Sequence, residues 1–110
     1  MLLPVSAAMM DACVLSTLEK EDAYGYVITQ QLCTGVGVSE STLYPVLRRL
    51  QKDGCLSVYD VAISGRNRRY YHLTPHGQSA LEAYRREWVE YKKRIDCILA
   101  PEAKEEKHDT

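Results

Sequence analysis

The sequence predicts a mainly helical α+β fold, with four helices and one β-hairpin. Apolar residues recur at helical spacing in four segments, which begin near residues 9, 23, 39 and 75. Between the third and fourth segments, two short β-type stretches flank a turn rich in glycine and arginine. A chain of 110 residues can bury one modest core, so we expect a single compact unit.

The charge of the chain is unevenly distributed. Hydrophobic residues make up 45% of the sequence and charged residues 26%, which argues against disorder. The net charge of −1 gives no sign of nucleic-acid binding, but residues 39–72 hold six Lys/Arg against three Asp/Glu. That region carries +3 and the remainder −4. One basic region on an otherwise acidic protein predicts a contact with a polyanion.

The first two helices are expected over residues 9–19 and about 23–33. The first is apolar nearly all round, so it should be buried on more than one side. We expect Asp22 to cap the second helix, and Gly35 and Gly37 to end it. The inward side of the second helix is expected to comprise Val27, Ile28 and Leu32.

A third helix is expected to begin near Ser39 or Ser41 and to end before Gly54. An early proline is tolerated there because the first amides of a helix lack intrahelical partners. Its buried side is formed by Leu43, Val46, Leu47 and Leu50. The opposite stripe is either a solvated polar face or a DNA-reading surface. It comprises Ser41, Pro45, Arg48 and Lys52, with Tyr44 and Arg49 on its flanks.

Two antiparallel strands are expected over residues 56–59 and 69–73. Gly65 and Asn67 would allow the backbone to reverse between them. Helices followed by such a hairpin form the winged-helix arrangement. Basic side chains at a hairpin tip repel one another in water, but they are stabilised beside phosphates or in a DNA minor groove.

The last helix should begin at Thr74 and Pro75, a capping residue followed by proline at the first helical position. Beyond it, large apolar residues recur at alternating spacings of 3 and 4, an a/d seam. We expect this seam to meet a second copy of the chain, although packing back on the same domain remains open. The seam comprises Leu81, Tyr84, Trp88, Tyr91, Ile95 and Ile98. Residues 101–110 lack an apolar pattern and are expected to form a disordered tail.

The sequence offers little support for an enzyme, a metal site or a membrane protein. Its four cysteines are scattered without a CxxC pair, so we expect small buried residues in a reducing cytoplasm. Zinc ligands drawn from Cys55, His72 and His76 would have ill-matched spacings. No stretch approaches the ~20 apolar residues of a membrane span. An enzyme built on Cys55 or Cys97 would lack a nucleophile elbow, a phosphate loop or paired carboxylates, so neither catalysis nor a cofactor is expected.

Three motifs follow one another in an order that is typical of one known family. They are YGY at 24–26, STLYPVLRRL at 41–50 and RRYYHLT at 68–74, together with Asp53-Gly54 and Gly77. Over about residues 9–99 the chain resembles the PadR family of bacterial transcriptional regulators, in its short form with a single C-terminal helix. One departure is Tyr24, where members of the family often carry histidine.

The resemblance implies a homodimeric repressor that binds double-stranded DNA at a pseudo-palindromic operator. Residues 1–74 would form the DNA-binding domain and residues 75–100 the dimerisation helix. Short polar groups near the start of the third helix would face the groove, while arginines farther along would hold phosphates. The implied DNA-binding residues are Tyr26, Ser41, Thr42, Tyr44, Pro45, Arg48, Arg49, Lys52, Arg66, Asn67, Arg68 and Arg69.

Two further questions concern a small-molecule effector and an alternative function. Some members of the family respond to flat aromatic compounds near the dimer interface, which implies an effector site at Trp88 with Tyr84 and Tyr91 beside it. The alternative is that Trp88 simply packs in the seam. A winged-helix protein-interaction module without DNA binding is the alternative function. It would be expected to have an uncharged wing and helix face, which this sequence lacks.

Overall fold

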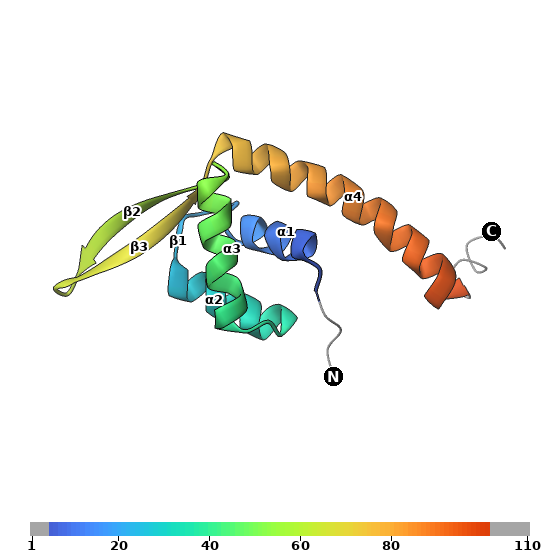
Figure 1. The fold of residues 1–110 in the computed structure, drawn as a ribbon, viewed down its shortest axis with the longest axis horizontal. Coiled ribbons are helices and arrows are strands. Elements are labelled where there is room, and N and C mark those ends of the chain that lie inside the picture. Colours follow the sequence, from blue (N-terminus) through green and yellow to red (C-terminus); the bar gives the residue numbers. More distant parts are fainter. Residues whose placement is uncertain (1–4, 102–110) are drawn as a thin grey trace.

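A computed structural model of the chain describes residues 5–101. Within this range, three helices pack beside the base of a three-stranded antiparallel sheet whose hairpin extends to one side, while a long last helix extends to the other (Figure 1). The predicted mainly helical α+β winged-helix fold is therefore confirmed. Residues 102–110 of the expected tail lie outside the described range. The elements in chain order are α1 (Ala7–Thr17), β1 (Ala23–Tyr24), α2 (Gly25–Val36), α3 (Glu40–Lys52), β2 (Leu56–Ile63), β3 (Arg66–Leu73) and α4 (Pro75–Leu99).

The core lies where α1, α2 and α3 meet the base of the sheet and the first turns of α4. Ser6 caps the N-terminus of α1, and its hydroxyl oxygen accepts a hydrogen bond from the amide of Met9 at 3.2 Å. The buried side of α3 is the predicted one, with Val46 only partly buried. The largest fully buried side chains belong to Val14, Leu15, Ile28, Thr29, Leu43, Leu47 and Leu81.

Helix α2 differs from its prediction at both ends and on one side. It continues to Val36 and ends at Gly37, which adopts the left-handed conformation with φ of 76°. Tyr24, not Asp22, occupies the N-cap position. Val27 is 40% exposed, because the buried stripe follows the i, i+4 pair of Ile28 and Leu32.

The hairpin is longer than predicted, and its reversal lies elsewhere. Strands β2 and β3 are eight residues each and pair from Leu56 opposite Leu73 to Ile63 opposite Arg66. The turn consists of Ser64 and Gly65, with φ of 51° and 78°. Positive φ at both positions is the requirement of the two-residue type I′ turn, so Asn67 lies within β3 and not in the turn. The two-residue strand β1, which was not predicted, pairs with β3 on its other edge.

Close backbone packing joins α3, the sheet and α4. The chain leaves α3 through Gly54, whose φ is 82°. The hydroxyl of Thr74 donates to the Gly54 carbonyl at 2.7 Å, and its oxygen accepts from the amide of Gly77 at 3.0 Å, which makes Thr74 the predicted cap of α4. A β-carbon on Gly77 would collide with the carbonyl oxygen of Cys55. These contacts set the position of the hairpin relative to α3.

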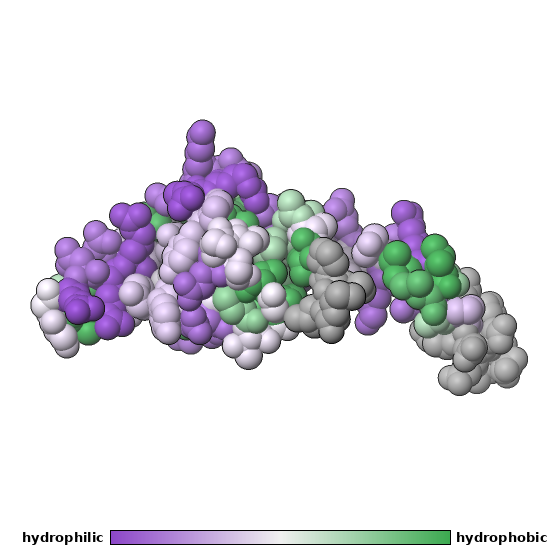
Figure 2. Space-filling view, turned by 60° about the horizontal axis from the view of Figure 1, so that its bottom comes forward, coloured by the Kyte–Doolittle hydropathy of each residue, from purple (hydrophilic) through white to green (hydrophobic). Residues whose placement is uncertain are grey.

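Helix α4 has two different parts. Leu81 is 1% exposed within the core, and Tyr84 packs against that core, so the start of the predicted seam packs back on its own domain. Leu81 therefore cannot contribute to an interface with a second copy, which corrects the prediction. From Trp88 onward the large apolar side chains are mostly exposed, and Figure 2 shows apolar surface gathered toward the C-terminal end of α4.

Candidate nucleic-acid interface

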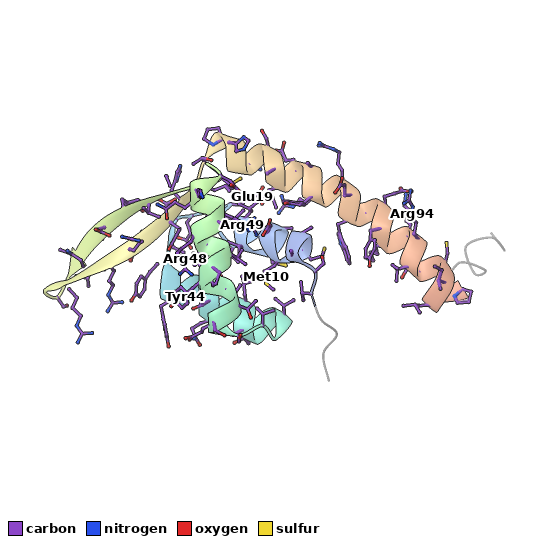
Figure 3. All side chains as sticks on the ribbon, in the orientation of Figure 1. Met10, Glu19, Tyr44, Arg48, Arg49 and Arg94 are labelled. Carbon is purple, nitrogen blue, oxygen red and sulfur yellow. The ribbon has the colours of Figure 1, made fainter. Side chains whose placement is uncertain are left out.

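A groove lies between α3, β3 and the start of α2, and we call it the α3–β3 groove. Its volume is about 360 Å³. Tyr44 and Arg48 project from the side of α3 that faces the hairpin (Figure 3). Two guanidinium groups from different elements therefore border one hollow that is otherwise lined mainly with tyrosine. The lining residues are Tyr24, Gly25, Tyr26, Tyr44, Arg48, Arg69 and Tyr71.

The N-terminal end of α3 presents small polar groups beside this groove. Ser39 caps the helix, accepting a hydrogen bond from the amide of Thr42 at 3.3 Å. Its hydroxyl also lies 3.1 Å from that of Ser41 and 2.9 Å from that of Thr42. Pro45, in the second turn, has no amide hydrogen to donate to the carbonyl of Ser41. These exposed acceptors and donors suit the reading of base edges.

The basic residues of the hairpin are divided between the two faces of the sheet. Side chains alternate along a strand, so Asn67 and Arg69 share the face of Tyr71, while Arg66 and Arg68 lie on the opposite face. Arg69 lines the α3–β3 groove, and its Nε lies 3.9 Å from Asp60 of β2. All four residues were predicted to form the wing together, because the expected strand began only at Arg69 and left residues 66–68 in the turn.

The opposite face of the sheet carries a row of tyrosine rings. Tyr59 stacks on Tyr70 with ring centroids 5.7 Å apart, and Tyr70 lies 6.1 Å from Tyr24. The guanidinium carbon of Arg68 lies 5.0 Å from the centre of the Tyr24 ring. A cation over an aromatic face is attracted by the ring, so this contact orders Arg68 against Tyr24, on the sheet face opposite that of Arg69.

Asp22 ties the loop before β1 to this same face. Its carboxylate accepts a hydrogen bond from the Tyr59 hydroxyl at 2.6 Å and lies 2.8 Å from Nδ1 of His72. The bonds from Tyr59 and then His72 lower the pKa of Asp22, and the bond to Asp22 raises the pKa of Tyr59. Asp22 was predicted to cap α2 because it precedes that helix, and nothing near it in the sequence indicates partners on β2 and β3.

Arg49 does not join Arg48 on the groove side of α3. Its two terminal nitrogens bind both carboxylate oxygens of Asp11, and Nη1 also lies 3.9 Å from Asp53. Hydrogen bonding to Asp11 raises the pKa of Arg49 against an opposing effect of burial. The structure therefore separates Arg49 from Arg48 and pairs its guanidinium with Asp11, and the role of Arg49 as a phosphate ligand stays a prediction.

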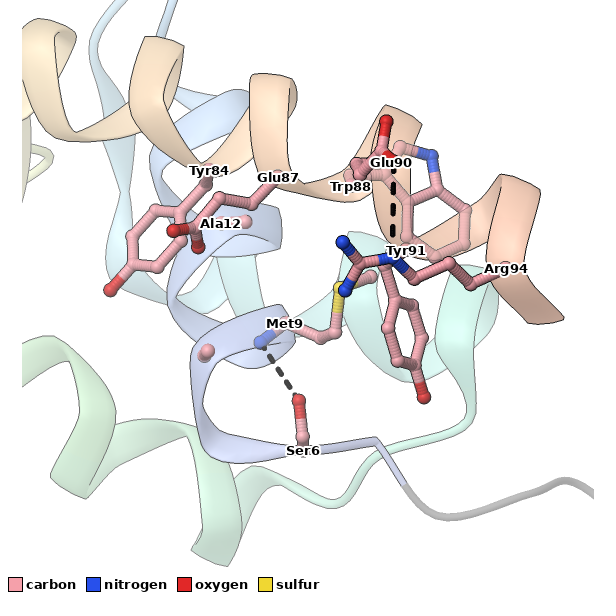
Figure 4. Close-up of a pocket in the computed structure, with 10 residues that line it drawn as sticks. Ser6, Met9, Ala12, Tyr84, Glu87, Trp88, Glu90, Tyr91 and Arg94 are labelled. Atoms are coloured by element: carbon pink, nitrogen blue, oxygen red, sulfur yellow. Dashed lines mark hydrogen bonds and ion pairs between the residues drawn. The ribbon is translucent and has the colours of Figure 1, made fainter.

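A second groove lies between α1 and α4, and we call it the α1–α4 groove. It has a volume of about 550 Å³. Trp88 and Tyr91 line it with ring centroids 6.2 Å apart, and Met9 of α1 lies opposite (Figure 4). Arg94 and Glu90 lie at its edge, with Nε and Oε1 3.8 Å apart. The structure thus brings together the three predicted effector residues, Tyr84, Trp88 and Tyr91.

Three other expectations concern cysteines, metals and membranes. Cys55 is buried and Cys13 and Cys33 are half-buried, but Cys97 is exposed on α4, so the prediction of burial is wrong for Cys97. Residues 5–101 contain no group of three or more His, Cys, Asp or Glu side chains that could hold a metal ion. Within the same range, no helix has the length and apolar character needed to cross a bilayer.

Comparison with known proteins gives matches over most of the chain. The model of the transcriptional regulator PadR-like family matches residues 14–83. The transcriptional regulator Rv3488 of Mycobacterium tuberculosis is 37% identical over 83 residues, which is 74% of this chain and 78% of that protein. The crystal structure of smu.1704 from Streptococcus mutans matches with a TM-score of 0.82 at 43% identity. The match covers 90% of this chain and 93% of the smu.1704 chain. The crystal structure of a PadR family transcription regulator from Clostridium difficile matches with a TM-score of 0.76 at 34% identity. That match covers 83% of this chain and 98% of the other.

Proposed function

Because the chain belongs to the PadR-like family of transcriptional regulators, we propose that it is a sequence-specific DNA-binding repressor that acts as a homodimer on a pseudo-palindromic operator. Regulators of this family bind DNA, usually dimerise and are generally not enzymes. The observation that carries the proposal is the α3–β3 groove, where Arg48 of α3 and Arg69 of β3 border one hollow. Two guanidinium groups on a concave surface suit a DNA phosphate, which each can bind with paired hydrogen bonds.

The proposed DNA-binding residues, in the α3–β3 groove and beside it, divide between base reading and backbone binding. The exposed start of α3 would enter the major groove, with Ser41, Thr42, Tyr44 and Pro45 nearest the base edges. Residues farther from the helix start would hold the phosphate backbone and fix the register. The backbone set comprises Tyr26, Arg48, Lys52, Asn67 and Arg69. We assign smaller contributions to Arg66 and Arg68, which lie on the other face of the sheet.

Dimerisation is supported by the exposed half of α4. Trp88, Tyr91 and Ile98 are 42%, 55% and 73% exposed, although each is a large apolar side chain at seam spacing. Exposed apolar surface of this kind is typical of an interface. A second copy packed along Trp88, Tyr91, Ile95 and Ile98 would present two α3 helices to half-sites about one DNA turn, ~34 Å, apart.

We further propose that the α1–α4 groove admits a flat aromatic effector beside Trp88. The support is its lining: Trp88, Tyr91, Tyr84 and Met9 supply aromatic and apolar contacts, and Glu87, Glu90 and Arg94 supply charge. Trp88 is the only tryptophan of the chain, so its fluorescence reports directly on this groove. Saturable quenching by aromatic compounds is the expected result, and an unchanged signal across a broad panel would remove the effector from the proposal.

DNA binding can be tested on fragments from just upstream of the protein's own coding region, because small repressors often control neighbouring genes. Fluorescence anisotropy should show one fragment bound far more tightly than unrelated DNA of equal length. Arg48→Met should weaken this binding at least severalfold. Lys93→Met is the matched control, since it removes one exposed positive charge from the outer side of α4. Equal binding of all fragments, or equal loss in both variants, would contradict the proposal.

A further inference from the structure

We propose that Asp11 is a positioning residue for DNA recognition, whose buried carboxylate joins α1, α3 and α4 and couples the placement of α3 to that of α4. The inference rests on the proposed function, because it concerns how the α3–β3 groove is held. Asp11 does not line that groove and would not touch DNA. Its role is exerted through Arg49 and Tyr84.

The contacts of Asp11 use both of its carboxylate oxygens. One oxygen accepts from Nη2 of Arg49; the other accepts from Nη1 of Arg49 at 3.1 Å and from the hydroxyl of Tyr84 at 3.2 Å. Asp11 is 6% exposed. Three helices therefore meet at one carboxylate, through side chains 38 and 73 positions away in the sequence.

The Arg49 contact fixes the rotation of α3. A paired guanidinium–carboxylate contact is planar and tolerates little rotation of either partner. Arg49 directly follows Arg48, so the side chain that lines the α3–β3 groove and the side chain that binds α1 leave neighbouring positions of the same backbone. A buried carboxylate is stabilised only when its partners remain in place, so any shift of α3 about its axis is opposed at Asp11.

The Tyr84 contact brings α4 into the same junction. Tyr84 lies one turn after Leu81, which is fixed in the core, and one turn before Trp88, which is exposed. It projects from α4 toward α1 and lines the α1–α4 groove (Figure 4). Its hydroxyl reaches Asp11. Burial first, and then the neighbouring Asp11 charge, raise the pKa of Tyr84, so the hydroxyl remains a donor. A displacement of α4 along α1 therefore removes one donor from the carboxylate that holds Arg49.

The test compares Tyr84→Phe, Arg49→Lys and the double variant in the full-length protein. Tyr84→Phe deletes only the hydroxyl, and Arg49→Lys keeps the charge but cannot make the paired contact. Each is expected to weaken operator binding about threefold or more while leaving binding to unrelated DNA unchanged. The double variant should be no weaker than the worse single variant, because both changes act through Asp11.

Three further measurements separate positioning from general loss of structure or charge. Tyr70→Phe removes the hydroxyl of a half-buried tyrosine on the sheet and should bind the operator like the unmodified protein. Melting temperatures should show every variant fully folded at the assay temperature. Arg49→Met removes the charge at this position and should keep the full salt dependence of binding, whereas removal of a phosphate ligand reduces the slope by about 0.9.

The outcomes distinguish the inference from the function on which it rests. Unchanged operator affinity in Tyr84→Phe, or strictly additive losses in the double variant, would overturn the role of Asp11 while leaving DNA binding intact. A reduced salt slope in Arg49→Met would also overturn it, by making Arg49 a phosphate ligand. If the unmodified protein bound no DNA specifically, the proposed function would fail first, and the inference with it.

Discussion

Arg48 and Arg49 are neighbours in the sequence but serve different sides of α3: Arg48 borders the α3–β3 groove, and Arg49 binds Asp11 of α1. Successive residues of an α-helix are about 100° apart around its axis, which is enough to separate the two guanidinium groups. The basic surface available to DNA is consequently smaller than the local charge of the sequence suggests. It is also better defined, because the arginine that does not face the groove helps to hold the helix that does.

The two faces of β3 predict unequal effects of neighbouring arginines. Arg69 lines the α3–β3 groove, whereas Arg68 lies over the Tyr24 ring on the opposite face. We expect Arg69→Met to weaken operator binding severalfold and Arg68→Met to weaken it clearly less, as measured by anisotropy titration. The two variants make the same change in charge at adjacent positions, so each is the control for the other. Equal losses would mean that both faces of the hairpin contact DNA.

The exposed half of α4 predicts a dimer that one charge can disrupt. Trp88→Glu places a carboxylate in the centre of the apolar seam, where it would be desolvated without a partner. Sedimentation equilibrium at micromolar concentration should show the unmodified protein as a dimer and this variant as a monomer. Lys93→Glu, on the outer side of the helix, should remain dimeric. A Trp88→Glu variant that stays dimeric would place the interface elsewhere.

The Glu19–Arg85 ion pair predicts a specific loss of stability in acid. Arg85 donates to both carboxylate oxygens of Glu19 at 2.8 and 2.9 Å, and Gln78 donates at 3.0 Å. Hydrogen bonds from Arg85 and then Gln78 lower the pKa of Glu19 from 4.5 to about 2. Since the folded-state pKa is the lower one, the stabilisation is complete above pH 4.5 and is lost as the pH falls toward 2.

Arg85→Met should raise the folded-state pKa of Glu19 and reduce this acid-dependent loss. Urea unfolding from neutral pH down to about pH 2 should therefore give a flatter stability curve for the variant than for the unmodified protein below pH 4.5. Arg86→Met, which removes an exposed arginine one position along α4, should leave the curve unchanged. Parallel curves for Arg85→Met and the unmodified protein would show that the pair does not lower the pKa in solution.

Substitution of alanine at two glycines is expected to change the free energy of unfolding in opposite directions. In Gly77→Ala the added β-carbon would collide with the Cys55 carbonyl oxygen and would lie 2.7 Å from a Leu73 methyl carbon. Because backbone must move to relieve this contact, we expect a loss of at least about 2 kcal/mol in the free energy of unfolding. Gly35 lies in α2 with nothing within 4 Å of such an atom, so Gly35→Ala should stabilise by about 0.5–1 kcal/mol. An unchanged free energy of unfolding in Gly77→Ala would mean that the start of α4 does not pack as closely on Cys55 as the structure shows.

Local rules predicted the elements whose ends are set by nearby residues. The limits of α3, its apolar side and the Thr74 cap of α4 were all readable because helical periodicity and capping act within a few positions. The hairpin was recognised but drawn too short, since Arg66 and Asn67 look like turn residues and not like strand residues. Strand β1 has only two residues, too few for any alternation to show.

The errors at the site have a different cause, which is distance along the chain. Nothing near Arg49 in the sequence reveals that its partner lies on α1. One sign was available, because Asp11 is the single acidic residue of the apolar helix α1 and a buried carboxylate needs a cation. Asp22 and Leu81 were misassigned for the same reason, because their partners come from strands and helices remote in sequence. Periodicity shows which face of an element is apolar, but it does not show which element covers that face.

The salt dependence of operator binding gives the sharpest check on the α3–β3 groove. The logarithm of the binding constant is plotted against the logarithm of the salt concentration for the unmodified protein and for Arg48→Met. If Arg48 neutralises a DNA phosphate, the steepness of the line falls by about 0.9 for each half-site whose phosphate is no longer neutralised. A parallel line for Arg48→Met would contradict the assignment of the groove to DNA.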